Sequence, residues 1–338
     1  MLENKKISQS IFKYIIFIII SILIISTNAS SENKLNLLGI ENEFIIQFED
    51  GNLYGNITYP KVHDINTPVI IIVSDLGNFD RNGKIDTNNN NYYKKLAYQL
   101  SNNGIITIRY DKRGIGDSAD LVGKKTPSIS QHKDDLIQIL NYINKKMGRS
   151  DNKIYLLGHS DGSLIVGMAA QQRNLSGLIF YSLEATKQKE IIKERLKKDN
   201  KHLYENEQLN DKVILIDTFN NLLSAIENDN KFIIKDKNIP KRYENLFLSL
   251  YYQKDYSKEL LNLDPLKLIG KQNSPSLIIN GKEDKSLTEN GINKLKELNN
   301  IKIQWHHLDG LTHFLLNEES FIDSRVLNLT LRFIYKNN

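Results

Sequence analysis

The sequence predicts an α/β fold in which a mostly parallel β-sheet carries helices on both faces. Three observations indicate it. Short apolar runs alternate with segments of helical periodicity over most of the 338 residues. Near the beginning of this pattern, Asp50-Gly51 joins two apolar runs, as the turn of an antiparallel hairpin would. One later run passes through a Gly-x-Ser-x-Gly pentapeptide directly into a helical segment.

The composition suits a chain with a large apolar core. Hydrophobic residues make up 40% of the chain and charged residues 25%, so a core can form without covalent staples. The formal net charge is +5, but no basic stripe with interleaved aromatic residues is present, and we expect no nucleic-acid partner. The chain has no cysteine, which excludes disulfides, cysteine nucleophiles and thiolate metal sites.

Residues 1–29 have the three regions of a secretory signal peptide. Three early lysines precede an almost wholly apolar run at 14–25, and small residues follow at 26–29. The apolar run is shorter than the roughly 20 residues that a membrane-spanning helix needs. We therefore expect export to the periplasm or the medium, a mature start near Ser30, and no membrane association after cleavage. An uncleaved N-terminal membrane anchor is the alternative.

The segment 30–185 predicts the first part of the α/β core. Strands at 43–49 and 52–59 form the opening hairpin, and Pro60 ends the second of them. The run at 68–73 is apolar at every position, which indicates a parallel strand buried on both faces. Further along, the sequence predicts strands at 105–110, 153–157 and 177–181, and helices at 92–100, 130–147 and 163–170.

The segment 264–338 predicts the rest of the core, and the stretch 186–263 interrupts it. Strands at 276–280 and 301–306 and a closing helix at 321–335 complete the expected elements. The interrupting stretch is highly charged, lacks a clear buried strand, and is too long for a simple loop. We expect a helical cap over the C-terminal edge of the sheet, where open α/β sheets bind ligands. A peripheral helical decoration without substrate contact is the alternative.

The pentapeptide Gly158-His159-Ser160-Asp161-Gly162 carries the chemistry. Between a strand and a helix, this pattern holds a serine hydroxyl above the sheet on a strained turn. The two glycines lack the Cβ atoms that would clash there. The start of the helix directs N–H groups and a partial positive charge toward a developing oxyanion. The sequence therefore predicts Ser160 as a nucleophile and the N–H of Asp161 as one oxyanion donor.

A serine nucleophile needs a base, and the base needs an acid that orients it. After a Gly-x-Ser-x-Gly elbow, the acid comes next along the chain and the histidine last. His313, in the segment beyond the last predicted strand, is the expected base, and His307 is the alternative. Asp284, just after the strand at 276–280, is the expected acid. Its neighbour Glu283 and the earlier Glu184 are the alternatives.

Three further motifs carry a resemblance to a known family. They are Asp80-Arg81-Asn82-Gly83, the run from Arg109 to Ser118, and the strand with its loop at 276–284. Together with the pentapeptide, they resemble the α/β-hydrolase superfamily, in a branch of bacterial serine esterases and serine-aminopeptidase-like hydrolases. The resemblance spans residue 43 to the C-terminus, with the cap least matched. It implies the α/β-hydrolase fold and hydrolysis of carboxylic esters, or of amides or peptides, without a metal or cofactor.

The expected oxyanion loop departs from that family at one position. The loop at 74–83 follows the buried strand, and the N–H of Leu76 is the candidate second donor. Relatives usually have glycines here, as in Gly-Ser-Gly, where this chain has Asp75-Leu76-Gly77. A carboxylate that pointed inward would oppose a developing negative charge. One that pointed away would bond nearby backbone instead.

These observations predict an exported serine hydrolase that cleaves carboxylic esters with short or medium acyl or aryl groups. The substrate class is a small-molecule ester or a short peptide, and the reaction passes through an acyl-enzyme. A peptidase or amidase of the same fold is the first alternative. A hydrolase-fold protein that binds a ligand and turns over little is the second, because of Asp75.

Overall fold

The computed structural model describes residues 39–84, 91–121, 126–203, 214–235, 239–271, 273–298 and 300–337. The signal peptide expected at 1–29 lies outside these ranges. Within the ranges, no helix has both the length and the apolar character that crossing a bilayer requires.

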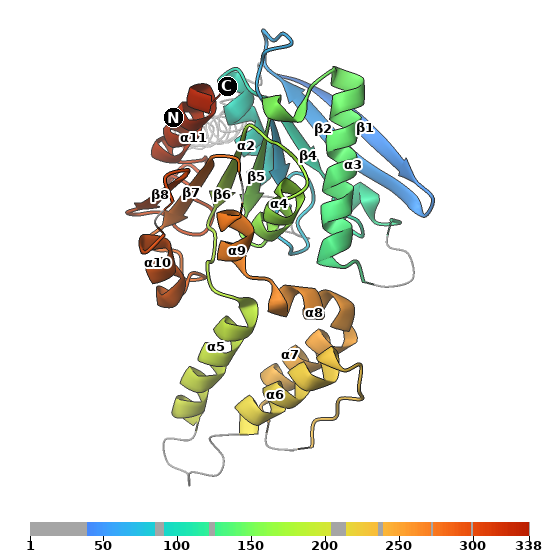
Figure 1. Cartoon of the computed structure of the whole chain (residues 1–338), viewed down its shortest axis with the longest axis vertical. Coiled ribbons are helices and arrows are strands. Elements are labelled where there is room, and N and C mark those ends of the chain that lie inside the picture. The colour runs from blue at the N-terminus through green and yellow to red at the C-terminus, as the bar shows by residue number, and fades with distance from the viewer. Residues whose placement is uncertain are drawn as a thin grey trace, which may run out of the picture. The chain divides into compact units, whose positions relative to one another are not determined.

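The described residues form an eight-stranded sheet in the order β1-β2-β4-β3-β5-β6-β7-β8 (Figure 1). The hairpin strands β1 and β2 are antiparallel, and β2 also runs antiparallel to β4. All other neighbouring strands are parallel. This confirms the predicted mostly parallel sheet with an N-terminal antiparallel hairpin. The strands are β1 (Ile40–Phe48), β2 (Gly51–Tyr59), β3 (Val69–Val73), β4 (Ile106–Tyr110), β5 (Ile154–His159), β6 (Gly177–Tyr181), β7 (Ser276–Gly281) and β8 (Ile303–Leu308).

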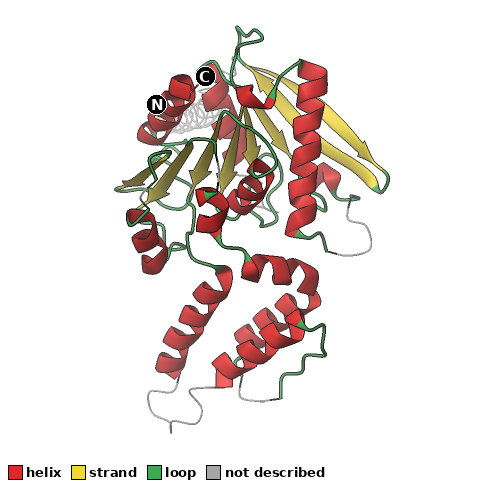
Figure 2. Ribbon diagram, in the orientation of Figure 1, coloured by secondary structure: helices red, strands yellow, loops and turns green. Residues whose placement is uncertain are grey.

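Helices cover both faces of the sheet, as Figure 2 shows. Successive side chains of a strand point to opposite faces, so the apolar run of β3 serves two cores. Ile71 and Val73 pack in the cluster that contains α3 and α4, whereas Ile70 and Ile72 pack with α2 and α11. The flanking helices are α2 (Tyr92–Asn102), α3 (Ile129–Met147), α4 (Gly162–Ala170), α9 (Pro265–Gly270), α10 (Glu289–Lys296) and α11 (Ser324–Asn337), with the short turns η1 (Gly116–Ser118) and η2 (Asp151–Lys153).

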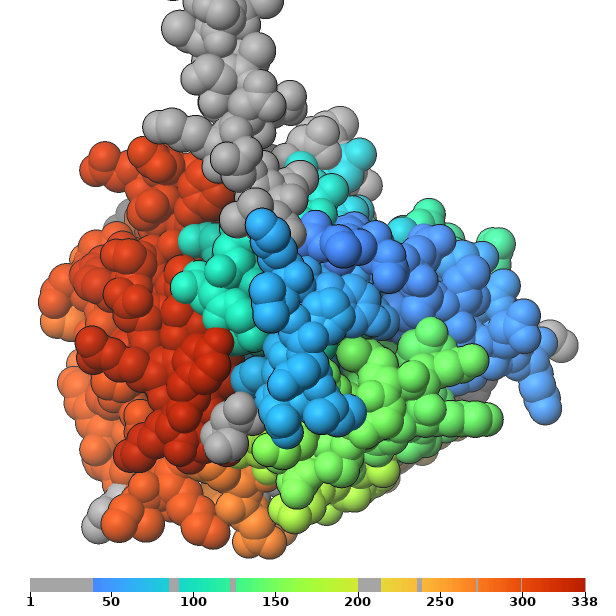
Figure 3. Space-filling model, turned by 90° about the horizontal axis from the view of Figure 1, so that it is seen from above, coloured from blue at the N-terminus to red at the C-terminus, as the bar shows by residue number. Residues whose placement is uncertain are grey.

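Besides pairing with β4, the hairpin packs against α3. The rings of Phe44 on β1 and Tyr142 on α3 stack with their centroids 5.2 Å apart. In the view of Figure 3, the hairpin (blue) and α3 (green) lie on the same face. A capping box fixes the start of α3, because Ser128 Oγ accepts from the N–H of Gln131 and the Gln131 side chain accepts from the N–H of Ser128.

Two of the family motifs meet in a buried ion-pair network. Arg81 binds Asp111 at 2.6 Å, and the same carboxylate accepts the backbone N–H groups of Arg81 and Asp117. Arg113 makes a two-pronged ion pair with Asp135 on α3, at 2.6 and 2.7 Å. The Arg81–Asp111 bonds hold the loop after β3 against the loop after β4, and the Arg113–Asp135 pair holds the loop after β4 against α3.

Between β6 and β7, the described residues form helices and no strand. Four helices build a separate apolar cluster that includes Phe219, Leu222 and Phe247. Leu260 and Leu263, at the end of this segment, pack instead against the cluster that fills one face of the sheet. The four helices are α5 (Gln188–Leu203), α6 (Ile214–Glu227), α7 (Lys241–Tyr252) and α8 (Lys254–Asn262).

Candidate active site

Ser160 occupies a strained turn between β5 and α4. Its φ angle is 53°, in the left-handed region that a side chain rarely adopts. The turn persists because Ser160 N–H donates to the carbonyl of Tyr181 on β6, at 2.8 Å. A Cβ on Gly158 would lie 2.6 Å from Ser163 Cα, and one on Gly162 would lie 2.5 Å from Ser74 O. Both glycines are therefore required, and the turn has the geometry of a nucleophile elbow.

His313 and Asp284 meet beyond the C-terminal ends of β7 and β8. His313 Nδ1 lies 2.9 Å from Asp284 Oδ2. The other carboxylate oxygen accepts from the N–H and the hydroxyl of Ser286, at 2.9 and 2.6 Å. An ionised carboxylate only accepts, so Nδ1 carries the proton and Nε2 is left as the basic nitrogen. This is the arrangement that a general base requires.

The alternative acids and the alternative base have other roles. Glu184 accepts from the N–H groups of Thr186 and Thr288, each at 2.6 Å, and so braces the start of α10. Glu283 is exposed. His307 stacks on Trp305 with ring centroids 5.5 Å apart. Within the described ranges, none of the three alternatives hydrogen-bonds to the predicted base or nucleophile.

The base lies against the residue that precedes the nucleophile. The rings of His313 and His159 are 4.8 Å apart. The carbonyl of His313 accepts from the hydroxyl of Ser182, at 2.6 Å. No hydrogen bond joins Ser160 Oγ to His313 Nε2 among the described residues; such bonds are often loose before substrate binds and tighten in the complex.

Charge sets the protonation of the base and the acid. Burial lowers the pKa of His313, but the hydrogen bond and charge of Asp284, with the charges of Asp75 and Asp161, raise it by more, so the net pKa lies above 6.5. Burial raises the pKa of Asp284, whereas the hydrogen bonds from His313 and Ser286 lower it to below 3.8 overall. Asp284 is therefore ionised at neutral pH, and the base form of His313 requires a pH above its raised pKa.

The two backbone N–H groups predicted to stabilise an oxyanion have no hydrogen-bond acceptor among the described residues and are therefore available to a substrate. In the described part of the chain, the backbone N–H groups of Leu76 and Asp161 donate to no acceptor. The two residues that precede Leu76 are held by hydrogen bonds. Asp75 N–H donates to the hydroxyl of Tyr93 at 2.8 Å, and the buried ammonium of Lys112 donates to Asp75 O at 2.5 Å and to Ser74 Oγ at 2.6 Å.

Asp75 acts on the site electrostatically. Burial, followed by the negative charge of Asp75, raises the pKa of Asp161 to about 7. Gln188 on α5 donates to Asp161 Oδ1 at 3.1 Å and lowers that pKa in part. The charge of Asp75 also raises the pKa of His313. Its carboxylate therefore lies close enough to shift both groups, rather than being screened from them.

Replacing Asp161 with Asn is expected to stabilise the fold, and more so in alkali. Because the folded pKa of Asp161 is about 7 and its ordinary value is 3.8, the folded state holds this proton more tightly than the unfolded chain. The associated stability is present below pH 3.8 and is lost as the pH rises through about 7. Thermal unfolding of wild type and Asp161→Asn near pH 4 and near pH 8 measures it. Equal Tm shifts at the two pH values would contradict this account.

A small cavity of mixed polar and apolar lining lies beside Ser160. Its volume is about 10 Å³, room for roughly one water molecule. The helical segment between β6 and β7 contributes to its wall, since Leu260 belongs to α8 and Gln188 to α5. The lining residues are Ser160, Asp161, Leu164, Leu183, Glu184, Thr186, Gln188, Leu260, Leu263 and Pro265.

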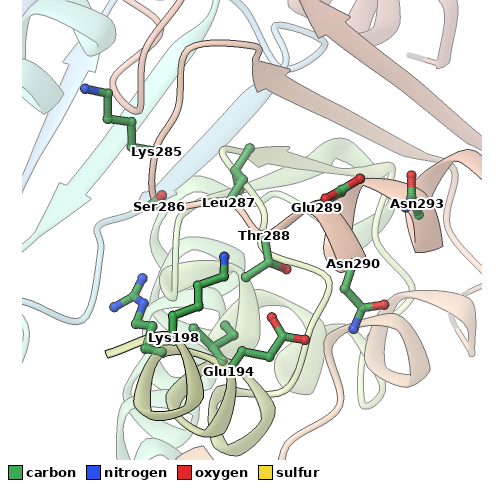
Figure 4. A pocket seen from close by; sticks show the side chains of 11 residues that line it. Glu194, Lys198, Lys285, Ser286, Leu287, Thr288, Glu289, Asn290 and Asn293 are labelled. Atoms are coloured by element: carbon green, nitrogen blue, oxygen red, sulfur yellow. The ribbon is translucent and has the colours of Figure 1, made fainter. Parts of the chain in front are cut away.

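A larger cavity, of about 470 Å³, lies between α5 and the segment that follows β7. In Figure 4, Glu194 and Lys198 extend from α5 toward the segment that carries Ser286 and Thr288. Ser286 Oγ lies 3.0 Å from His313 Nδ1, so this cavity adjoins the Nδ1 side of the ring. A proton from the nucleophile must reach Nε2, on the opposite side. Neither Ser160 nor His313 lines the larger cavity, so we do not place the reacting bond there.

Several residues that hold the site were missed by the sequence analysis. Ser286 and Ser182 orient the acid and the base, and Lys112 holds the oxyanion loop. Lys112 lies within the motif that runs from Arg109 to Ser118, and this position is the only feature of the sequence that could have pointed to its role. Neither serine belongs to a recognisable pattern. Among the described residues, no group of three or more His, Cys, Asp or Glu side chains is arranged to hold a metal ion.

The comparisons with known proteins identify the family of the chain and its fold. The family model described as "Serine aminopeptidase, S33" matches residues 87–320. Esterase EstD of Thermotoga maritima is 25% identical over 300 residues, covering 84% of this chain. The chain spans 66% of that relative's length, slightly less than two thirds.

Solved structures show the same fold. Proline iminopeptidase of Mycobacterium smegmatis has a TM-score of 0.56 and 14% identity, covering 88% of this chain and 98% of its own. Est1E of Butyrivibrio proteoclasticus has a TM-score of 0.51 and 18% identity, covering 87% and 99%. Because the family model spans more than half of the residues, the chain belongs to the serine aminopeptidase S33 family of α/β-fold serine hydrolases.

Proposed function

We propose that the chain is an exported serine hydrolase that cleaves carboxylic esters with short or medium acyl or aryl groups. Ser160 is the nucleophile, His313 the base and Asp284 the acid. The observation that carries the proposal is the 2.9 Å contact between His313 Nδ1 and Asp284 Oδ2, with the ring of His313 4.8 Å from that of His159, the residue before a serine on a left-handed turn. The esterase relative supports ester chemistry. The signal-peptide pattern of residues 1–29 supports export.

The reaction follows from these positions. His313 Nε2 takes the proton of Ser160 as Oγ attacks the ester carbon, and the carbonyl oxygen becomes an oxyanion. The N–H groups of Asp161 and Leu76 stabilise that charge, each by about 3 to 4 kcal/mol of barrier. The proton then passes from His313 to the departing alcohol, leaving an acyl-enzyme. Water, deprotonated by the same imidazole, attacks the acyl carbon and releases the acid and free Ser160. Asp284 stabilises the imidazolium in both halves.

We also propose that residues 186–263 act as a cap on a core made of 30–185 and 264–338. Leu260 of α8 lines the cavity at the nucleophile, and Gln188 of α5 bonds to Asp161. The leucines of this cavity favour an apolar acyl or aryl group over a polar polymer. Because this cavity holds only about one water molecule, any acyl group must displace part of its wall, and shorter acyl chains displace it least.

A second candidate, aminopeptidase activity, is favoured by one observation. Asp161 and Glu184 both line the cavity at Ser160, and after burial the charges of Asp75 and Glu184 raise the pKa of Asp161. A negative site beside the nucleophile suits the ammonium group of an aminoacyl substrate. Comparing kcat/KM for p-nitrophenyl acetate and butyrate with kcat/KM for aminoacyl p-nitroanilides separates the two. Faster cleavage of the anilides would favour the peptidase.

Labelling with a fluorophosphonate probe tests the proposed function. The full-length chain is expected to react at one serine, which peptide mapping identifies as Ser160, because only a hydroxyl with an adjacent base attacks phosphorus quickly. Heat-denatured protein serves as the control and is expected to remain unlabelled. Modification of a different serine would reassign the nucleophile. An unmodified chain that also leaves p-nitrophenyl esters intact would indicate a binding protein of this fold.

A further inference from the structure

His159 is a buried histidine that the proposed reaction does not use. It lies between Gly158 and the nucleophile, and its side chain is fully shielded from solvent. Aromatic rings surround it, with centroids 4.8 to 5.8 Å away: those of Tyr92, Tyr93, His313 and Phe314. An apolar residue would cost less free energy to bury here than an imidazole, because a buried polar ring needs hydrogen-bond partners for both nitrogens.

Both nitrogens of His159 do have partners. Nε2 lies 3.1 Å from the carbonyl oxygen of His313, and Nδ1 lies 3.0 Å from the hydroxyl of Tyr93. That hydroxyl in turn accepts the backbone N–H of Asp75, at 2.8 Å. The three contacts form one continuous chain from the oxyanion loop to the base.

The donor and the acceptor of each of these hydrogen bonds can be assigned, starting from the carbonyl of His313. A carbonyl oxygen only accepts, so His159 Nε2 carries the proton and donates to His313 O. Nδ1 is then unprotonated and accepts from the hydroxyl of Tyr93. The Tyr93 oxygen remains free to accept the N–H of Asp75. Burial, aided by the positive charge of His313, lowers the pKa of His159 to about 4, so the ring stays neutral near pH 7.

The two ends of this series of hydrogen bonds, Asp75 and His313, matter for the reaction. Asp75 immediately precedes Leu76, whose N–H is a proposed oxyanion donor. His313 is the proposed base, and its carbonyl is held only by His159 and Ser182 among the described residues. Neither His159 nor Tyr93 lines the cavity at Ser160. Their influence is therefore on the geometry of the machinery and not on substrate contact.

We propose that His159, with Tyr93, is a positioning residue that couples the oxyanion loop to the base loop through directed hydrogen bonds. The proposal rests on the proposed function, since it assigns His159 a task in that reaction. Displacing catalytic groups by about 1 Å costs up to about 100-fold in rate. Breaking these hydrogen bonds is therefore expected to lower kcat while leaving KM nearly unchanged.

Two substitutions of His159 separate positioning from packing. His159→Gln keeps an N–H donor near the place of Nε2 but loses the ring, whereas His159→Phe keeps the ring but loses the donor. If His159 positions the base, the Gln variant retains kcat for p-nitrophenyl acetate within about fivefold and the Phe variant loses about 100-fold. If the ring only packs against its aromatic neighbours, the order reverses. A Phe variant as active as the Gln variant, or more so, overturns the proposal.

The tautomer of His159 is a second test, which needs no substitution of His159 itself. A proton–nitrogen correlation spectrum of full-length protein labelled with ¹⁵N-histidine near neutral pH is expected to show a neutral Nε2–H ring for His159. Tyr93→Phe removes one oxygen atom, assigns the signal, and is expected to shift the resonance of the unprotonated Nδ1. A neutral Nδ1–H ring, or an unchanged Nδ1 resonance in Tyr93→Phe, overturns the proposal even if the His159 variants fail to fold.

The two tests distinguish failure of this inference from failure of the proposed function. If wild type is labelled by fluorophosphonate at Ser160 and the order of the His159 variants is reversed, the reaction stands and the positioning role is lost. If wild type neither reacts with the probe nor hydrolyses esters, the proposed function fails. The NMR spectrum in that case still reports whether the hydrogen-bond chain exists.

Discussion

Ser160→Ala is expected to lower kcat for p-nitrophenyl acetate by about 10⁶-fold, because removal of a triad nucleophile eliminates the acyl-enzyme route. The fold is expected to tolerate the change. The Cβ atom and the left-handed φ of 53° are retained, and the backbone bond to Tyr181 O does not involve the hydroxyl. The Tm should therefore stay close to the wild-type value. Steady-state hydrolysis and thermal unfolding of the same preparations measure both quantities.

Ser163→Ala is the matched control for that experiment. Ser163 lies one turn further along, is buried, and donates a single hydrogen bond from Oγ to Gly158 O at 3.2 Å. Its loss should reduce stability by about 1 kcal/mol and leave most of the activity intact. Equal rates for wild type and Ser160→Ala would contradict the proposed function at its centre.

Asp284→Asn is expected to lower kcat by about 10⁴-fold, because an amide neither stabilises the imidazolium nor enforces the correct tautomer of His313. The pH profile should change as well. In wild type, kcat/KM rises with pH through the pKa of His313, which lies above 6.5 because Asp284, together with the charges of Asp75 and Asp161, outweighs the effect of burial. Without the Asp284 carboxylate the pKa of His313 is expected to fall, and the acid limb of the remaining activity is expected to move to lower pH.

Glu283→Gln is the control for that variant, because it neutralises the adjacent carboxylate in the chain. Glu283 is exposed and is not among the groups that chiefly set the pKa of His313. Its activity and pH profile should match wild type. A large loss in Glu283→Gln with little change in Asp284→Asn would exchange the two assignments.

Much of the fold could be predicted from local sequence patterns. The all-apolar run at β3 indicated a strand covered on both faces, and its alternate residues do serve two separate cores. Asp50-Gly51 indicated the antiparallel hairpin, which β1 and β2 form. These features depend on neighbours within a few residues, so the sequence records them directly. The insertion at 186–263 was recognised because it lacks a clear buried strand. Its helical character could be predicted, but the bounds of its helices could not.

The same distinction between local pattern and tertiary contact applies to the candidate site. By itself, the sequence determined the residue types and their order: a serine between two close-packed glycines, then a loop aspartate, then a loop histidine. It left three carboxylates open as the acid and gave no sign of what Asp75 does. Tertiary structure alone decided that Asp284 faces His313, that Glu184 braces α10, and that Asp75 acts on the charged groups of the site. It also joined His159 to both loops. The reason is physical: these contacts connect residues far apart along the chain, and their geometry exists only once the parallel strands bring their C-terminal ends together.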